Sequence, residues 1–347
     1  MRAVVTARFG GVDSLEYHED WPTPEAVPSG EALVRVEYCG VNPLDAFSRR
    51  VQWAGMEVPR VQGSEVVGSV EHLPSGYSGE LQVGDRVVVN PYRHCGECAS
   101  CARGKTNLCD RLAGTIWGVT TDGGYAEYCS VPPRSLVKAP RGANPLDLLL
   151  GISPLTAYHA LHARIGLEAG EVVLVWGATG GVGSAAVQLA KLAGATVVAV
   201  VGGEAKVSVA RDLGADHVVD RHAVDVLDEV RRLTSGRGVD AVLEHPGAAT
   251  WERSLKALRF GGRLAIVGAT TGFDARVHLG HMFVKQWALM GSTGGTMGDL
   301  RELVSLASSG KFGVLVDEVL PLAKVGKAHE RIERGDVVGK LALDPGA

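Results

Sequence analysis

The spacing of apolar positions changes near residue 150. Before this point, short apolar runs are separated by Gly, Pro and Asp, a pattern typical of β-strands joined by turns. The strands predicted in this part cover residues 3–7, 31–38, 64–71, 86–89 and 126–131. We therefore expect a β-rich first part that forms a compact, partly closed barrel with long loops.

After residue 150, strand and helix patterns alternate. The run Glu171–Trp176 is continuously apolar, as in a strand buried on both faces. Further strands are predicted over residues 196–201, 217–219, 239–244 and 262–267, and helices over residues 182–192, 205–213, 225–233 and 251–258. Five alternating units predict an α/β fold with a doubly wound parallel sheet. The pattern is mixed again after about residue 290, so we expect one domain of residues 1–151 and 291–347 and a second of residues 152–290.

Length and charge limit the classes of partner. A chain of 347 residues suggests two domains. The net charge is −4 with Lys and Arg scattered, so we expect no nucleic-acid partner. No apolar run reaches the roughly 18 residues that span a bilayer, and the N-terminus has the pattern of a first strand instead of a signal peptide. We expect a cytoplasmic protein with no membrane partner.

Four cysteines are closely spaced in one loop: Cys95, Cys98, Cys101 and Cys109. Gaps of two residues let a tight loop turn several thiolates toward one point, and a fourth cysteine closes a tetrahedron. We therefore expect one structural Zn²⁺ with no open coordination position. The alternative is free or disulfide-bonded cysteines, but this spacing in a long chain favours a metal. Cys39 and Cys129 are interpreted as packed small residues.

A glycine-rich turn follows the strand at Glu171–Trp176. It consists of Ala178, Thr179, Gly180, Gly181, Val182 and Gly183, and it matches G-x-G-x-x-G with Ala at the first glycine. Gly180 would let the backbone approach a pyrophosphate, and Gly183 would let the helix pack closely on the strand. The N-terminus of that helix would attract the anion. We expect a dinucleotide site; the alternative is a tight turn with no ligand.

The end of the second strand indicates which dinucleotide binds. NAD-binding chains usually have an acidic residue there for the ribose 2′-OH. Here Gly202 and Gly203 leave room for a 2′-phosphate, which Lys206 and Arg221 could neutralise. We favour NADP(H) over NAD(H). Lys206 could instead be a solvated lysine in the first turn of a helix.

Several motifs together resemble the medium-chain dehydrogenase/reductase superfamily over nearly the whole chain. They are the cysteine quartet, VGDRVVV at 83–89, GGYAEY at 123–128, GATGGVGSAAVQLAK at 177–191 and LGADHVVD at 213–220. The resemblance implies a GroES-like catalytic domain, a Rossmann domain and an active site in the cleft between them. It also implies a homodimer or homotetramer.

Zinc-dependent alcohol dehydrogenases of that superfamily use a second, catalytic zinc. Its ligand positions correspond here to Asn42, Ser64 and Ile152, and these side chains are poor zinc ligands. The positions of the proton relay correspond to Leu44 and Phe47. The resemblance therefore predicts no catalytic zinc, and without a Lewis acid or a relay alcohol oxidation is a poor first expectation.

The segment GVNPLD at residues 40–45 is similar to the GVNxxD of zinc-free quinone oxidoreductases and enone reductases. This likeness implies hydride transfer from NADPH to a quinone, an enone or a related conjugated carbonyl. Asn42 is then the candidate hydrogen-bond donor to the substrate oxygen. Those relatives often have a Tyr after the Asp; here the proton would come from water, Tyr92 or His94.

The resemblance also implies roles for further residues. Asp45 and Glu65 would lie near the cleft. They would act in catalysis or have a structural role, as an internal ion pair or a hydrogen bond that holds Asn42, and Arg49 is a plausible partner. Thr156 would orient the nicotinamide, as a residue of both the catalytic and the cofactor site. The remaining candidates for cofactor contacts are Gly247, Gly268, Ala269, Ser292, Thr293, Gly294 and, at a phosphate, Lys340. The candidates for a substrate wall are Phe47, Trp53, Tyr92 and Trp117, with ordinary core packing as the alternative.

Two other functions remain open. One is an alcohol dehydrogenase or ketone reductase with weak activity. The other is a cofactor-binding protein that has lost turnover.

Overall fold

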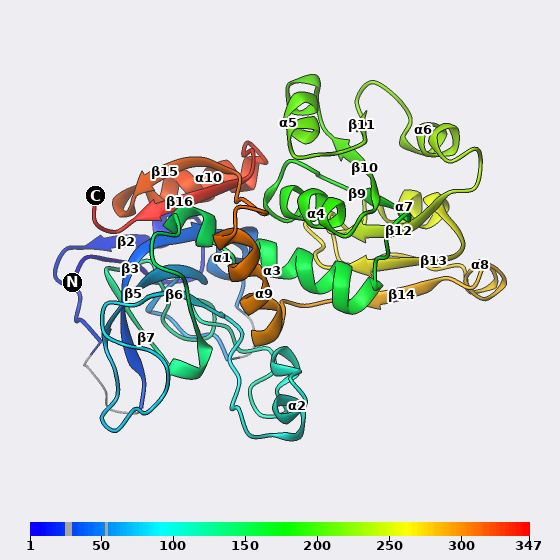
Figure 1. Cartoon of the computed structure of the whole chain (residues 1–347). Helices are drawn as coiled ribbons and strands as arrows, with labels where there is room; N and C mark the ends of the chain where they lie inside the picture. Colours follow the sequence, from blue (N-terminus) through cyan, green and yellow to red (C-terminus); the bar gives the residue numbers. More distant parts are fainter. Residues whose placement is uncertain (25–29, 53–54) are drawn as a thin grey trace. The chain divides into compact units, whose positions relative to one another are not determined.

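The computed structural model describes residues 1–24, 30–52 and 55–347 and divides into two compact units (Figure 1). Unit 1 contains residues 1–155 and 294–347, and unit 2 contains residues 156–293. Both boundaries lie a few residues beyond those expected from the sequence. Among the described residues, no helix combines the length and the apolar character needed to cross a membrane.

Unit 1 is built on two β-sheets. The larger has the strand order β15-β16-β3-β5-β6-β8, with β7 paired to the other part of β3. Its strands are β3 (Ala32–Val41), β5 (Glu65–His72), β6 (Arg86–Val89), β7 (Tyr128–Val131), β8 (Leu136–Lys138), β15 (Val316–Pro321) and β16 (Lys340–Asp344). The smaller sheet has the order β2-β1-β4, formed by β1 (Ala3–Thr6), β2 (Leu15–His18) and β4 (Arg60–Val61).

The last strand brings the end of the chain back to unit 1. β16 pairs antiparallel with β3, with Leu341 opposite Val41. This register places Lys340 beside Asn42, the residue that follows β3. The expected return of the chain to the first domain therefore has a direct structural consequence for the candidate site.

Short helices connect and cover the strands of unit 1. They are α1 (Pro43–Arg50), α2 (Ala99–Ala102), α9 (Met297–Ser308) and α10 (Val325–Arg334), and α3 (Ser153–Tyr158) runs across the boundary with unit 2. The backbone N–H of Asn42 donates to Asp45 Oδ2 at 2.8 Å, which stabilises the first turn of α1. Asn42 and Asp45 are thus held at a helix start.

Unit 2 contains the predicted parallel sheet, in the order β11-β10-β9-β12-β13-β14. This is the classic order of a dinucleotide-binding fold. The strands are β9 (Val172–Val175), β10 (Thr196–Val201), β11 (His217–Asp220), β12 (Val239–Glu244), β13 (Leu258–Ile266) and β14 (Ala288–Gly291). The main helices are α4 (Gly181–Leu192), α5 (Val207–Asp212), α6 (Val226–Leu233), α7 (Trp251–Ala257) and α8 (Leu279–Val284). The sequence pattern did not predict β14, because this edge strand is short and only partly buried.

Candidate functional site

The four cysteines of the loop converge as predicted. Their sulfur atoms all lie within 4.8 Å of one another, with Cys95 Sγ 4.0 Å from Cys101 Sγ and Cys98 Sγ 3.9 Å from Cys109 Sγ. Tetrahedral zinc with Zn–S bonds of about 2.3 Å requires sulfur atoms about 3.8 Å apart. The cluster therefore fits a closed Zn²⁺ site.

The surroundings lower the pKa of the Cys95 and Cys109 thiols and raise that of Cys101. The N–H of Cys95 donates to Cys109 Sγ at 3.3 Å, and the N–H of Cys98 donates to Cys95 Sγ at 3.3 Å. Backbone N–H groups of Glu97 and Cys98 hold the pKa of the Cys95 thiol below its usual value. Burial raises the pKa of Cys101 to about 12, and a bound cation would offset this by stabilising the thiolate. Because all four ligands come from the protein, this metal would stabilise the loop without touching a substrate.

A second cluster of polar groups is buried in unit 1, around Glu65 at the start of β5. The carboxylate of Glu65 is 0% exposed. Its Oε1 accepts a hydrogen bond from the N–H of Ile152 at 2.9 Å, and its Oε2 accepts one from Asn42 Nδ2 at 3.1 Å. Lys340 Nζ lies 2.5 Å from the same Oε2 and forms a buried ion pair.

Lys340 has a partner for each of its three N–H groups. Besides Glu65, its ammonium donates to Asn42 Oδ1 at 2.8 Å and to Ser153 Oγ at 3.3 Å. Asn42 Oδ1 also accepts from Ser153 Oγ at 3.0 Å. The cluster of Asn42, Glu65, Ser153 and Lys340, which we call the lysine cluster, thus satisfies its own charges and polar atoms.

Asp45 lies beside this cluster and has a structural position. In addition to capping α1, it accepts from the Ser64 hydroxyl at 2.9 Å and from the Ser64 N–H at 3.2 Å, both at Oδ1. Asp45 is 0% exposed, and burial raises its pKa from 3.8 to about 6 despite these hydrogen bonds. Its contacts join the start of α1 to the residue that precedes β5.

In unit 2, the glycine-rich turn connects β9 to α4. Gly180 precedes the first helical residue, and its N–H donates to Gly177 O at 2.9 Å. A Cβ at Gly183 would collide with the carbonyl of Gly177, so this position requires glycine for close packing. The N–H groups in the first turn of α4, including those of Val182 and Gly183, have no partner within the helix and can bind an anion.

The loop after β10 lies beside an arginine. The Arg221 guanidinium lies against Gly202, where a Cβ would be only 3.0 Å from its Nε and Nη2. The carboxylate of Asp220 accepts from the N–H of Gly203 at 2.9 Å, which fixes this loop. Lys206 directly precedes α5 and is half-buried.

Loops at the carboxyl ends of β12 and β13 meet each other. A Cβ at Gly247 would lie 2.8 Å from Ala269 Cα, and one at Gly268 would lie 3.0 Å from His245 O. Glu244 holds the first of these loops, because its Oε1 accepts from the Gly247 N–H at 2.9 Å. The two loops thus lie at the same edge of the sheet as the glycine-rich turn.

Comparison with known proteins gives consistent matches over both units. Residues 28–141 match the alcohol dehydrogenase GroES-like domain, and residues 181–309 match the zinc-binding dehydrogenase family. An NAD-dependent alcohol dehydrogenase of Sulfolobus acidocaldarius is 33% identical over 356 residues, covering 99% of each chain. The solved structure of an NAD-dependent alcohol dehydrogenase is 37% identical with a TM-score of 0.94, covering 100% of both chains. The chain belongs to the medium-chain dehydrogenase/reductase superfamily.

Two further relatives of this superfamily have other activities in their names. An acryloyl-coenzyme A reductase of Sulfurisphaera tokodaii is 28% identical over 330 residues, covering 94% of this chain and 96% of the relative. A quinone oxidoreductase of Pongo abelii is 28% identical over 353 residues, covering 99% and 97%. The protein is therefore an oxidoreductase of the nicotinamide-dependent type.

The residues at the superfamily's catalytic zinc position do not fit a metal here. The amide oxygen of Asn42 already accepts from an ammonium, Ser64 hydrogen-bonds Asp45, and Ile152 contributes only its N–H. The one carboxylate, Glu65, is paired with Lys340. Zinc requires thiolate, imidazole or carboxylate ligands that are free to bind it, and this donor set lacks them.

Two of the expected roles meet competing contacts in the structure. Asn42 Nδ2 donates to Glu65 Oε2 and to Gly40 O, so a donation to a substrate oxygen would replace one of these bonds. The buried ammonium of Lys340 is used in the lysine cluster, so a contact with a cofactor phosphate would replace one of its partners there. Both roles stay predictions.

The expected pairing of Arg49 with Asp45 or Glu65 is wrong. Arg49 forms its ion pair with Glu333 at 2.5 Å, and its Nη1 lies 3.3 Å from Nδ1 of the buried His329. This pairing joins α1 to α10. The positive charge beside Glu65 is supplied by Lys340 instead.

The residues expected to form a substrate wall have different environments. Trp117 is buried in the hydrophobic core of unit 1, with the Arg93 guanidinium 4.5 Å from its ring centroid. Tyr92 is half-buried, and its ring occupies the space that a Cβ at Gly294 would need. Phe47 is half-buried on α1, and Trp53 lies outside the described residues. Of these four residues, Trp117 has the environment of an ordinary core residue.

The other expected cofactor residues are placed along unit 2. Thr156 is buried in α3, and the N–H of Ser292 donates to Ile266 O at 2.9 Å just after β14, with Thr293 next to it. Their contacts with a cofactor stay predictions.

Sequence reasoning missed His245 and Ser153. His245 follows β12, its ring lies against Gly177, and its Nε2 is 2.7 Å from Trp176 O. Its place directly after a buried parallel strand, at the ligand-binding edge of such sheets, was the signal available in the sequence. Ser153 joins the lysine cluster, and only its neighbour Ile152 was considered.

Proposed function

We propose that this protein is an NADPH-dependent reductase that transfers hydride to quinones, enones or related conjugated carbonyls without a catalytic metal. The observation that supports this most directly is the lysine cluster. Lys340 and Glu65 are paired where the superfamily's catalytic zinc ligands would be found, and Asn42 and Ser153 complete the hydrogen bonding.

The lysine cluster bears on the reaction because alcohol oxidation and the reduction of a conjugated carbonyl require different catalytic groups. Oxidation of an alcohol requires removal of its proton, which zinc promotes as a Lewis acid. Reduction of a conjugated C=C or a quinone begins with hydride addition, and the charge that develops on oxygen can be met by hydrogen bonds. An ammonium already shared among Glu65, Asn42 and Ser153 does not replace the Lewis acid.

Preference for NADPH is supported by the end of β10. Gly202 and Gly203 leave space beside the Arg221 guanidinium, which is suited to a 2′-phosphate. Lys206 adds a second cation within reach of the same loop by sequence. The relative from Sulfolobus acidocaldarius is named NAD-dependent, so we base the preference for NADPH on these residues of the present chain.

The residues of unit 2 would bind and orient the cofactor, which supplies the hydride when bound. Gly180 and the first-turn N–H groups of α4 would hold the pyrophosphate. Backbone of the Gly247 and Gly268–Ala269 loops would border the nicotinamide half, with His245 beside the turn. Burial lowers the pKa of His245, so its imidazole is neutral at pH 7 and adds no charge there.

The deciding experiment follows the hydride itself. The protein is incubated with NADPH deuterated at C4 and a panel of a quinone, an enone and a conjugated thioester, and the products are examined by NMR. We expect deuterium at the β-carbon of the enone or thioester, or consumption of the quinone, with turnover unchanged by added Zn²⁺.

Two other results would favour the remaining alternatives. Steady oxidation of alcohols or reduction of simple ketones, with no reaction of the conjugated acceptors, would indicate an alcohol dehydrogenase or ketone reductase. Tight NADPH binding with no deuterium transfer to any acceptor would indicate a protein that has lost turnover. Either result would refute the proposed activity.

A further inference from the structure

Unit 2 contains a cavity at the amino ends of its parallel strands. Its volume is about 540 Å³, within the usual range for small-molecule sites. The lining includes residues at the start of β13, the loop before β12 and one side of α6. The glycine-rich turn follows the carboxyl end of β9, so the cavity lies at the opposite edge of the sheet from the dinucleotide turn.

The cavity is strongly cationic on a chain whose net charge is −4. Five of its twelve lining residues are basic, and in the described part of the chain none of its lining residues is acidic. The basic residues are Arg231, Arg237, Lys256, Arg259 and Lys285. Three carboxylates next to the lining pair with four of these side chains: Asp228 with Arg231, Asp240 with Arg237 and Arg259, and Glu252 with Lys256. Five cations against three carboxylates leave an excess of positive charge, which attracts anions.

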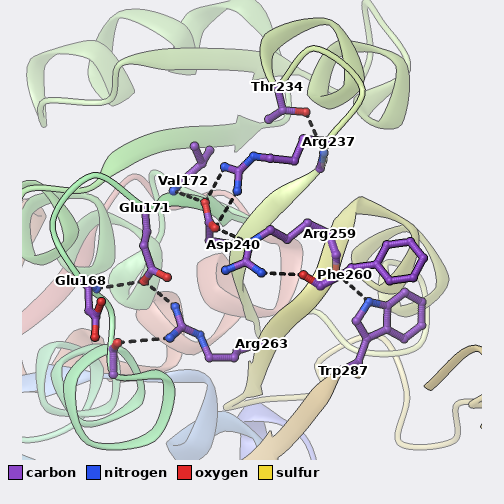
Figure 2. A network of polar contacts seen from close by, with 12 residues as sticks. Glu168, Glu171, Val172, Thr234, Arg237, Asp240, Arg259, Phe260, Arg263 and Trp287 are labelled. Carbon is purple, nitrogen blue, oxygen red and sulfur yellow. Dashed lines mark hydrogen bonds and ion pairs between the residues drawn. The ribbon is translucent and has the colours of Figure 1, made fainter. Parts of the chain in front are cut away.

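Two of the basic residues, Arg237 and Arg259, share the carboxylate of Asp240. Figure 2 shows Arg237 and Arg259 both directed at Asp240, which receives Arg237 Nη1 at 2.8 Å and Nη2 at 2.7 Å and also pairs with Arg259 Nε. Two guanidinium groups on one carboxylate leave one positive charge in excess. Although burial alone would raise the pKa of Asp240, the hydrogen bonds from Arg237, the Val172 N–H and Arg259 hold it well below its usual range. Asp240 is therefore ionised, and the two arginines are fixed in position.

The two lysines of the cavity are available for a ligand. Lys285 Nζ lies 4.8 Å from the centroid of the Trp287 ring and forms no ion pair with any described residue. Lys256 pairs with Glu252 at the surface, with both side chains more than half exposed. An exposed pair of this kind contributes little and exchanges readily for a better anion.

The remaining lining is apolar. Val230, Ala257 and Leu258 are nearly fully buried and form part of the cavity lining, and the Phe260 ring at its rim is 66% exposed. Figure 2 shows Phe260 next to Arg259, whose Nη1 donates to the Phe260 carbonyl. An apolar lining with convergent cations suits a molecule that has an anionic head and a flat apolar body.

We propose that this cavity is a second binding site, separate from the cofactor site, for a small organic phosphate with an aromatic or apolar body. The phosphate binds among Lys285, Lys256 and the free edges of Arg237 and Arg259. The apolar body lies against Leu258 and Phe260.

The test uses the full-length protein saturated with NADP(H), so that the dinucleotide turn is already filled. Binding of 1-naphthyl phosphate is measured by calorimetry, with inorganic phosphate and 1-naphthol as separate probes of the head and the body. We expect 1-naphthyl phosphate to bind more tightly than either. Lys285→Gln and Lys256→Gln should each weaken it about fivefold, whereas the matched control Lys311→Gln, an exposed lysine of unit 1, should not.

Three results would overturn the proposal. The first is that 1-naphthyl phosphate does not bind. The second is that inorganic phosphate binds as tightly, which would indicate an adventitious ion only. The third is that Lys311→Gln weakens binding as much as the cavity variants, which would indicate an effect of net charge. The two cavity variants remove exposed or half-buried charges and leave the buried Asp240 paired, so they are expected to fold.

Discussion

Replacing Lys340 by Met is the most direct perturbation of the lysine cluster. The side chains of Glu65 and Lys340 are 0% and 2% exposed, and their charged atoms are 2.5 Å apart. Lys340→Met would leave a buried carboxylate with only the Ile152 and Asn42 donors. Removing one partner of a buried ion pair typically costs about 3–5 kcal/mol, because the other charge stays desolvated.

This magnitude predicts a large change in thermal stability. For a unit of roughly 200 residues, 1 kcal/mol corresponds to about 2–4 °C in Tm. We expect Lys340→Met to lower the Tm of unit 1 by about 10 °C. The double variant Lys340→Met/Glu65→Gln should recover at least half of the loss, because no charge is then left unpaired.

The assay is calorimetric unfolding of the four proteins of this cycle, with Lys311→Met as the matched exposed control. The dissociation constant of NADPH is measured on the same samples. A loss below about 1 kcal/mol, or no recovery in the double variant, would show that the pair is not a closed buried ion pair. A large increase in the NADPH dissociation constant without a stability loss would restore Lys340 to its expected place at a cofactor phosphate.

Four further predictions concern other parts of the molecule. Elemental analysis should find one zinc per chain, and Cys109→Ser should lose this zinc and lower the Tm; retention of the metal would contradict the four-thiolate site. Arg221→Ala should weaken NADPH about tenfold more than NADH in fluorescence titrations, and equal weakening would remove the basis for the NADP preference. The pKa of Asp45 is raised from 3.8 to about 6 in the folded state, so the folded protein binds the proton more tightly and stability falls as pH rises through this window. Relative to Asp45→Asn, the wild type should lose about 2.5 kcal/mol between pH 3.8 and 6.5 in denaturant titrations, and a pH-independent difference would contradict this pKa. On α8, Leu279, Phe283 and Val284 are 72%, 74% and 59% exposed. Phe283→Asp should therefore reduce the mass found by light scattering, because it places a charge in this apolar surface, and an unchanged mass would exclude self-association through it.

The elements that could be predicted from the sequence are those whose signal is local. The buried strands of unit 2 are continuous apolar runs, and β10 and β12 begin and end at the predicted residues. The start of α5 differed, because Glu204–Lys206 forms a 3₁₀ turn before the helix begins at Val207. Short edge strands such as β14 carry too few buried positions to produce a clear pattern.

Within the candidate site, contacts between residues close in sequence could be predicted, and contacts between distant residues could not. The cysteine loop and the glycine-rich turn were predicted because all their members lie within 15 residues or fewer. Arg49 was matched to the wrong acid because its real partners, Glu333 and His329, lie on α10, some 280 residues away. Charge alone does not indicate which acid a buried arginine will meet.

By itself, the sequence determined the fold class, the metal loop and the dinucleotide turn, since each depends on spacing within a short segment. Only the tertiary structure decided the state of the candidate catalytic centre. The contact between Lys340 and Asn42 joins residues 298 positions apart and exists because β16 pairs with β3. A charge brought into a dry interior must find a partner there, and the identity of that partner is set by the register of two strands that the sequence pattern does not specify.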